Sequence, residues 1–267
     1  MGKTMLAKAI ARSFDCAFRR IQFTPDLLPT DITGVNVYNQ ERGDFEFKPG
    51  AVFANIVLGD EINRASPKTQ SALLESMEEQ QVTMDGVTYE LGTPFMVIAT
   101  QNPIEHEGTY PLPEAQLDRF MMRLSLGYPD VEAETEILAT HGRHSTLEDI
   151  KPVTDASGAG RMIAIAREVF VADALRRYIV DLVDSTRRHP DVYLGGSPRA
   201  SLMLLRATRA LAASEERDYA IPDDVKALAI PVLAHRLIVS ADAVMSGRDA
   251  ESVLTQALGE VPVPVDR

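Results

Sequence analysis

The sequence predicts an α/β fold up to about residue 129, followed by an all-α part that continues to residue 267. Two observations support this division. Short apolar runs such as "ANIVL" and "FMVIAT", typical of strands buried in a parallel sheet, alternate with helical segments in the first part. After Pro129 the helical periodicity continues, with almost no strand-like patterns.

Local patterns place the elements of the first part. Apolar residues recur at helical spacing in Thr4–Phe14, and Ser66 followed by Pro67 is typical of the start of a helix. "TPDLLPTDITG" contains two prolines and a glycine and is expected to be a loop. Asp-Gly between alternating segments indicates a hairpin. Hairpins are expected near Val35–Lys48 and Val82–Leu91. We also expect strands in "FRRIQF", "ANIVL", "FMVIAT" and "MMRLSL", and a short helix in "PEAQLDRF".

The second part is predicted to consist of amphipathic helices. The segment near "DIKPVTDASGAG" has turn chemistry and is expected to be a loop. The expected helices cover Glu132–His141, Arg161–Val169, Asp173–Arg188, Pro198–Ser214 and Pro222–Ile238.

Charge and cysteine content narrow the function classes. The net charge is -12, and acidic residues are spread over both parts, which argues against a dedicated nucleic-acid binder. Cys16 is the single cysteine, so no internal disulfide can form, and a reducing, cytoplasmic compartment fits best. No apolar run approaches the ~18 residues of a membrane span.

The chain begins "MGKTMLAKAI", in which Gly2, Lys3 and Thr4 match the last three positions of the phosphate-binding loop G-x-x-x-x-G-K-[ST]. The first glycine of that motif and most of its spacer are absent. Either the match is accidental, or the sequence starts inside a nucleotide site.

Two apolar runs end in polar residues suited to phosphate chemistry. "NIVLGDEINRA" places Asp60 and Glu61 at a strand end, where one carboxylate can hold Mg²⁺ and the other can polarise a water. The alternative is a solvated acidic turn. "FMVIATQNP" places Asn102 at a second strand end, where an amide can orient a water near a γ-phosphate. The alternative is a plain Asn-Pro turn.

Other polar side chains allow two interpretations. Arg119 ends the short helix and Arg199 opens a helix after "GGSP", and arginine suits phosphate oxygens, although surface arginines usually form weak salt bridges. His141 and His144 have the spacing of a metal pair. No third ligand is evident nearby, so a solvated helix end is favoured.

The order of these features is that of AAA+ ATPases, and the chain resembles the MoxR branch of that superfamily. The resemblance rests on "IQFTPDLLPTDITG", "GDEINRASPKTQSALLESMEE", "IATQNPIEHEGTYPLPEAQLDRF", "GGSPRA" and "AIPDDVKALAIPVLAHRL", which together span nearly the whole chain. It implies an AAA+ P-loop NTPase core over residues 1–129, with inserted hairpins, and a helical lid over residues 130–267.

The resemblance also implies a role for each candidate residue. Gly2, Lys3 and Thr4 bind nucleotide, with Lys3 on the β- and γ-phosphates and Thr4 on Mg²⁺. The remaining roles are metal binding for Asp60, water activation for Glu61, sensor 1 for Asn102, an arginine finger acting on the next subunit's ATP for Arg119, and sensor 2 for Arg199. Arg64 and Arg123 are further basic residues near the expected subunit edge, and a structural role is favoured for Arg123.

The activity implied is Mg²⁺-dependent hydrolysis of ATP by a homo-oligomer, expected to be a hexameric ring, which remodels partner proteins as a chaperone does. Proteins with von Willebrand factor A domains are the expected partners, and the two hairpins are where this clade meets partners or substrates. The alternatives are a truncated, non-hydrolysing interaction protein and an ATPase subunit of a magnesium-chelatase-type complex. A nucleic-acid motor is a more distant alternative.

The sequence departs from the family pattern at two places. The strand and most of the glycine-rich loop that precede Gly-Lys-Thr are missing, so we expect a misassigned start codon, a fragment, or a truncated paralogue that no longer hydrolyses ATP. Gly59 directly precedes Asp60, where it is expected to loosen the strand end and pack against nothing, with only a modest effect on stability.

Overall fold

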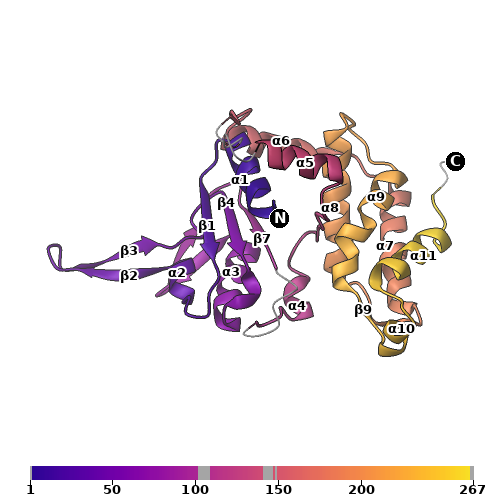
Figure 1. Cartoon of the computed structure of the whole chain (residues 1–267), viewed down its shortest axis with the longest axis horizontal. Helices are drawn as coiled ribbons and strands as arrows, with labels where there is room; N and C mark the ends of the chain where they lie inside the picture. The colour runs from indigo at the N-terminus through magenta and orange to yellow at the C-terminus, as the bar shows by residue number, and fades with distance from the viewer. Residues whose placement is uncertain (1, 102–108, 141–146, 148, 265–267) are drawn as a thin grey trace. The chain divides into compact units, whose positions relative to one another are not determined.

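The computed structural model describes residues 2–101, 109–140, 147 and 149–264 (Figure 1). The chain forms two compact units. Unit 1 contains Met1–Leu112 and Leu126–Gly160, and unit 2 contains Pro113–Ser125 and Arg161–Arg267. The domain boundary expected at residue 129 stays a prediction.

Unit 1 is built around a three-stranded parallel sheet with the order β1-β4-β7. Its strands are β1 (Phe18–Gln22), β4 (Ile56–Asp60) and β7 (Met96–Ala99). All three were predicted, β4 and β7 from apolar runs. In β4, the central strand, Ile56, Val57 and Leu58 are all buried, as expected for a strand between two neighbours with helices on the sheet's faces. Helix α1 (Lys3–Ser13) packs beside β4 and buries Ala7 and Ala11 (Figure 1).

Helix α3 (Pro67–Glu79) starts where the sequence predicted. The hydroxyl of Ser66 accepts a hydrogen bond from the Thr69 N–H, and Pro67 occupies the first turn. The side chain of Leu73 in this helix gives a reason for glycine at position 59. A Cβ at residue 59 would lie 3.3 Å from Leu73 Cδ2 and 3.2 Å from Phe23 Cε2. The expectation that Gly59 packs against nothing was therefore wrong, because its missing side chain lets two apolar side chains approach the strand.

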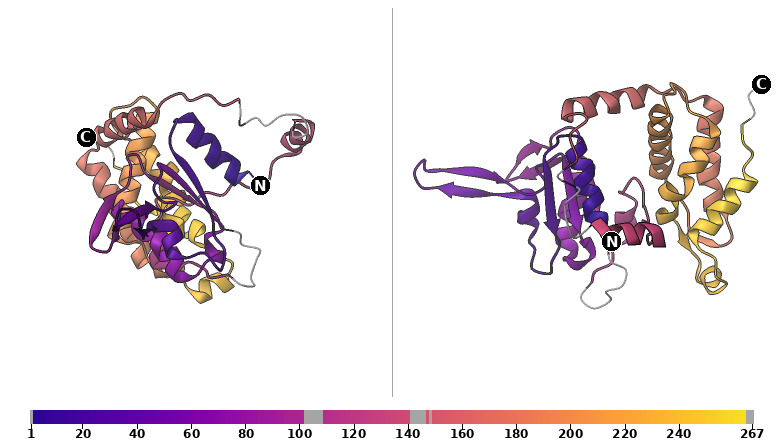
Figure 2. Two further views of the ribbon diagram at one scale, coloured as in Figure 1. Left: turned by 90° about the vertical axis from the view of Figure 1, so that its left-hand side faces the viewer. Right: turned by 45° about the horizontal axis from the view of Figure 1, so that its top comes forward.

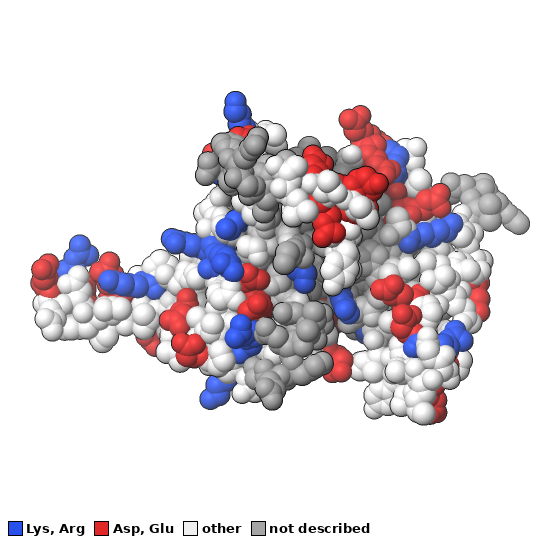
Figure 3. All heavy atoms as spheres, viewed as in Figure 1, with Lys and Arg blue, Asp and Glu red and all other residues white. Residues whose placement is uncertain are grey.

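Both predicted hairpins are present in unit 1. They are β2 (Gly34–Asn39) with β3 (Asp44–Pro49), and β5 (Gln81–Met84) with β6 (Val87–Glu90). The β2–β3 hairpin extends as a narrow ribbon (Figure 2) and carries acidic and basic side chains next to one another (Figure 3). Phe47 stacks on Tyr89 with ring centroids 3.9 Å apart, and the Asn36 amide donates to Asp85 at 2.6 Å, so the two hairpins support each other.

Two segments predicted as loops contain helix. Helix α2 (Pro29–Thr33) forms within "TPDLLPTDITG", because Pro29 fits the first turn and Asp31 accepts the Leu28 N–H at 2.9 Å. Helix α6 (Ala156–Glu168) starts before the predicted Arg161, because the Asp155 carboxylate accepts the Gly158 N–H at 2.7 Å as an N-cap does. Helix α5 (Val131–Thr140) lies where a helix was expected.

The strand predicted in "MMRLSL" is wrong. These residues are irregular, and all but Leu126 belong to unit 2. Their backbone groups find partners other than a strand: the Arg123 N–H donates to Pro231 O at 2.9 Å, and Met121 O accepts from the Arg236 guanidinium at 3.2 Å. Helical neighbours thus satisfy the hydrogen bonds that a sheet would otherwise supply.

Unit 2 is helical, as predicted, around one apolar core that includes Leu182, Leu204, Leu233 and Leu254. The predicted helix Pro222–Ile238 ends earlier, at Leu233, where a 3₁₀ turn and a short strand follow. No described helix in either unit is long and apolar enough to cross a bilayer. Helix α6 passes from unit 1 into unit 2. The elements that lie wholly in unit 2 are α4 (Glu114–Leu117), α7 (Asp173–Arg188), β8 (Val192–Leu194), α8 (Pro198–Ser214), α9 (Pro222–Leu233), the 3₁₀ helix η2 (Ala234–Arg236), β9 (Ile238–Val239), α10 (Ala241–Met245) and α11 (Ala250–Glu260).

Asp224 at the start of α9 is a buried carboxylate with a charged partner. Its side chain is 4% exposed and accepts two N–H groups of Arg217, at 2.6 and 2.9 Å, and the Ile221 N–H at 2.9 Å. Burial alone raises the pKa of Asp224, but the Arg217 hydrogen bonds and the Ile221 N–H bring it below the ordinary 3.8. The folded protein therefore favours the charged form, and this stabilisation is lost as the pH falls below about 4.

We expect Asp224→Asn to lower the free energy of unfolding by about 2–3 kcal/mol, because Arg217 keeps its charge in a partly buried place and loses its main partner. Asp223→Asn is the matched control, because that neighbour is 78% exposed and pairs with Lys226. It should change stability by no more than about 0.5 kcal/mol. Urea unfolding at neutral pH measures both, and equal effects would contradict the assigned role.

Candidate active site

The carboxyl ends of the three parallel strands bring polar side chains together at one edge of the sheet. β4 ends with Asp60 followed by Glu61, β7 is followed by Thr100, and Gln22 ends β1, where it pairs in register with Asp60. In open α/β sheets, ligands bind outside this edge.

The start of α1 reaches the same edge. Gly2 has φ 96°, a left-handed conformation that favours glycine, and it offers no side chain to cap the helix. The first N–H groups of α1 are thus placed as in an anion site. Thr4 Oγ1 donates to Asp60 Oδ2 at 3.2 Å, and Lys3 Nζ donates to the carbonyl of Gln101 at 3.1 Å. The structure therefore brings Lys3 and Thr4 next to the acidic strand end.

Asp60 is held by three side chains. Thr100 Oγ1 donates to Oδ1 at 2.5 Å, and Arg20 Nη2 donates to Oδ2 at 2.7 Å, beside the Thr4 contact. Burial raises the pKa of Asp60, but the hydrogen bond from Thr100 and the bonds and charge of Arg20 lower it overall, below its usual 3.8. The carboxylate is therefore ionised at neutral pH, as a metal ligand must be.

Glu61 has an unusual backbone. Its φ of 57° and ψ of 49° are left-handed, a conformation that is rare and costly for a residue other than glycine. The Glu61 N–H donates to Thr100 Oγ1 at 3.0 Å. The carboxylate accepts from Gln22 Nε2 at 2.8 Å and from Arg64 Nη1 at 3.0 Å. These contacts place the Glu61 side chain beside Asp60 but on separate partners, so the two neighbouring carboxylates can have different functions.

The residues at this edge fit a magnesium ion bound together with phosphate. Thr4 and Asp60 offer hard oxygen donors within 3.2 Å of one another. Mg²⁺ in nucleotide sites usually takes one or two protein ligands and completes its shell with phosphate and water. Within the described residues no cluster of three or more His, Cys, Asp or Glu side chains is placed to hold a metal. This donor set thus suits a phosphate-bridged ion better than a cage made of protein alone.

Three residues of this edge were not among the sequence candidates: Arg20, Gln22 and Thr100. Arg20 and Gln22 alternate with Ile21 on β1, so both point to one face of the sheet. A usable signal existed, because polar residues in the last positions of a parallel strand belong to the ligand-binding edge. Asn102, the expected sensor 1, lies outside the described residues, as do His141 and His144.

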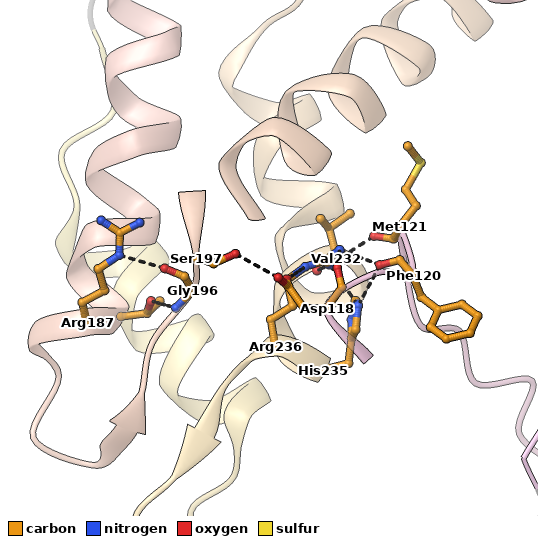
Figure 4. A network of polar contacts seen from close by, with 10 residues as sticks. Asp118, Phe120, Met121, Arg187, Gly196, Ser197, Val232, His235 and Arg236 are labelled. Carbon is orange, nitrogen blue, oxygen red and sulfur yellow. Dashed lines mark hydrogen bonds and ion pairs between the residues drawn. The ribbon is translucent and has the colours of Figure 1, made fainter. Parts of the chain in front are cut away.

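Arg119 and Arg199 both belong to unit 2, and a network of polar contacts joins the segments that carry them (Figure 4). Asp118 precedes Arg119. Its carboxylate accepts Arg236 Nε at 2.9 Å on one oxygen and Ser197 Oγ at 3.1 Å on the other. The pKa of Arg236 is lowered overall, mainly because its side chain is buried. The charge and hydrogen bond of Asp118 oppose this effect, and the positive charge of Arg199 adds to it.

The "GGSP" loop before α8 needs its glycines for close packing. A Cβ on Gly195 would lie 2.6 Å from the Arg187 Cα, so no larger residue fits without moving α7. The Gly196 N–H donates to Thr186 Oγ1 at 3.0 Å, and its carbonyl accepts Arg187 Nε at 2.8 Å. This loop is therefore fixed on α7, and the start of α8 with it.

The two other basic residues have identifiable contacts. Arg64 pairs with Glu61 at the sheet edge, and the Arg123 backbone bonds to Pro231 in unit 2. Their expected place near a subunit edge stays a prediction.

The buried His235, next to Arg236, makes the stability of unit 2 depend on pH. Burial, followed by the charge of Arg236, lowers the pKa of His235 from 6.5 to about 4. The folded protein keeps the ring neutral, whereas the unfolded chain protonates it near pH 6.5. Stability is therefore complete above about pH 6.5 and falls as the pH drops toward 4, by as much as about 3 kcal/mol.

We expect His235→Gln to flatten this dependence over the same pH range. Urea unfolding at several pH values between about 7 and 4.5, compared with wild type, measures it. Parallel curves for the two proteins would show that His235 does not titrate as its surroundings imply.

Comparison with known proteins assigns the fold to a class. Residues 1–122 match the ATPase family associated with various cellular activities (AAA), and residues 184–257 match the AAA lid domain. A crystal structure of a Cytophaga hutchinsonii protein, described as a candidate ATPase, superposes with a TM-score of 0.92 at 40% identity, covering 99% of this chain and 83% of that one. The fold is that of an α/β AAA core with a parallel sheet, followed by a helical lid.

Relatives that match nearly the whole of this chain identify the family within that class. The chain is 49% identical to the uncharacterized protein YeaC of Bacillus subtilis over 100% of this chain and 83% of that protein. It is 44% identical to the chaperone MoxR1 of Mycobacterium tuberculosis, over 99% and 72% of the two chains. It is 31% identical to the protein MoxR of Paracoccus denitrificans, over 98% and 84%. The chain belongs to the MoxR family of AAA ATPases.

Proposed function

We propose that this chain binds ATP with Mg²⁺ at the edge where β1, β4 and β7 end, and hydrolyses it to ADP and phosphate. The observation that carries the proposal is the contact between Thr4 at the start of α1 and Asp60 at the end of β4, with Lys3 and Glu61 beside them. A helix start that offers N–H groups and a lysine next to a paired carboxylate suits a triphosphate with its metal.

In this proposal each residue has the role that the family resemblance implies. Lys3 and the first N–H groups of α1 bind the β- and γ-phosphates, and Thr4 and Asp60 hold Mg²⁺. Mg²⁺ held by these two residues would neutralise charge that develops on the phosphate oxygens. Glu61 accepts a proton from the water whose oxygen attacks the γ-phosphorus, while the bond from that phosphorus to the β–γ bridging oxygen breaks and ADP leaves. Asn102 orients this water.

The assembly and the biological role are further parts of the proposal. Arg119 acts on ATP bound to the next subunit and Arg199 acts from the lid, so the active form is a ring, of six subunits as in the family pattern. The work performed is chaperone-like remodelling, which the word chaperone in the name of the Mycobacterium tuberculosis relative supports. The expected compartment is the cytoplasm. Proteins with von Willebrand factor A domains are the expected partners, by family analogy.

Phosphate release from ATP by the purified chain tests the proposal, with Lys3→Ala and chelation of Mg²⁺ as the two controls. Hydrolysis that both controls abolish is the expected result. Failure to bind ATP in the presence of Mg²⁺ would overturn it and favour the non-hydrolysing interaction protein. Genes for chelatase subunits beside this one would favour the magnesium-chelatase alternative, and turnover stimulated by DNA would favour a nucleic-acid motor.

A further inference from the structure

Arg236 of η2 is buried, and its guanidinium donates hydrogen bonds to the segment that carries Arg119. Its side chain is 1% exposed. Besides the Asp118 carboxylate, the guanidinium donates to the carbonyls of Asp118 at 3.2 Å, Phe120 at 2.5 Å and Met121 at 3.2 Å (Figure 4). Carbonyls on both sides of Arg119 are therefore fixed by one cation, which also bonds to Val232 of α9.

Ser197 joins this arrangement to the helix that carries Arg199. It occupies the N-cap position of α8, where a serine hydroxyl ordinarily accepts an N–H of its own helix. Here the side chain makes no capping bond, and its hydroxyl donates to Asp118 at 3.1 Å. The two oxygens of one carboxylate thus connect Arg236 to the start of α8, two residues before Arg199.

We propose that Asp118, Ser197 and Arg236 form a positioning node that makes Arg119 and Arg199 move as one body. This proposal rests on the proposed function, in which both arginines act on ATP. Because Arg119 acts on the neighbouring subunit's nucleotide, the node links the state of one ATP site to the next. Its three members are positioning residues that act through the two arginines.

Two serines at N-cap positions of unit 2 allow a matched comparison, because only one of them contacts the node. Ser240 does cap its helix, since it accepts the Ala243 N–H, and its own N–H donates to the Asp191 carbonyl and not to a member of the node. Ser197→Ala should lower kcat about 10-fold or more and reduce the Hill coefficient for ATP, with KM and melting temperature near wild type, because small displacements of charged groups are costly. Ser240→Ala should lower the melting temperature and leave kcat unchanged.

Wild-type kcat and Hill coefficient in Ser197→Ala would overturn the proposal, as would a loss matched by an equal loss in Ser240→Ala. Hydrogen exchange of the nucleotide-free chain is the second readout. In Ser197→Ala, amides of residues 118–122 should exchange faster together with those of the first turn of α8, and unchanged protection would overturn the node. If wild type does not hydrolyse ATP, the proposed function fails, while hydrogen exchange still decides the node.

Discussion

Replacing Glu61 by glutamine should leave binding of ATP and Mg²⁺ intact and slow hydrolysis by about 10²–10⁴-fold, the usual contribution of a positioned general base. Glutamine has the shape of glutamate and can still accept from Gln22 and Arg64, which contact the carboxylate at 2.8 and 3.0 Å. It cannot take a proton from the attacking water. Asp60, Thr4 and Lys3 remain, so the groups proposed to hold the nucleotide are unchanged.

Nucleotide affinity by calorimetry and single-turnover hydrolysis separate binding from chemistry in this variant. Glu75→Gln on α3 is the matched control, since that side chain is exposed and lies outside the site. It should behave as wild type. Wild-type turnover in Glu61→Gln would remove Glu61 from the role of base, and loss of ATP binding would assign it to the binding site instead.

The sequence predicted the parts of this site that depend on local patterns. Apolar runs that end in polar residues located β4 and β7, and the helix pattern after Gly-Lys-Thr located α1. Once the strands are known to be parallel, Asp60 must lie at the same edge as Thr100. These predictions need only the position of each strand along the chain, which an apolar run bounded by turns indicates well.

Contacts between distant segments could not be predicted in the same way. Gln22 reaches Glu61 because β1 and β4 pair in one particular register, and no local pattern encodes that register. Arg236 lies 118 positions from Asp118. The "MMRLSL" segment has strand-like residues, yet its backbone bonds to Pro231 and Arg236 instead. In each case a tertiary partner decides a question that propensity leaves open.

Arg119→Ala should lower kcat by about 10³-fold while ATP binding and the folding of each subunit stay near wild type, because a finger arginine stabilises charge only in the transition state. Arg177→Ala on α7 is the control, since that arginine is 77% exposed and forms a weak surface pair with Asp181. It should change nothing measurable in ATP turnover.

Mixing variants tests whether Arg119 acts on the neighbouring subunit. Lys3→Ala loses its own ATP site but still offers Arg119, whereas Arg119→Ala keeps the site and lacks the arginine. In a ring with head-to-tail interfaces, a random equal mixture makes roughly one interface in four competent. Activity should therefore return in the mixture although each variant alone is inactive. Subunits that assemble together without any recovery would show that Arg119 acts within its own subunit or not on ATP at all, and the argument for a ring as the active form would lose its main support.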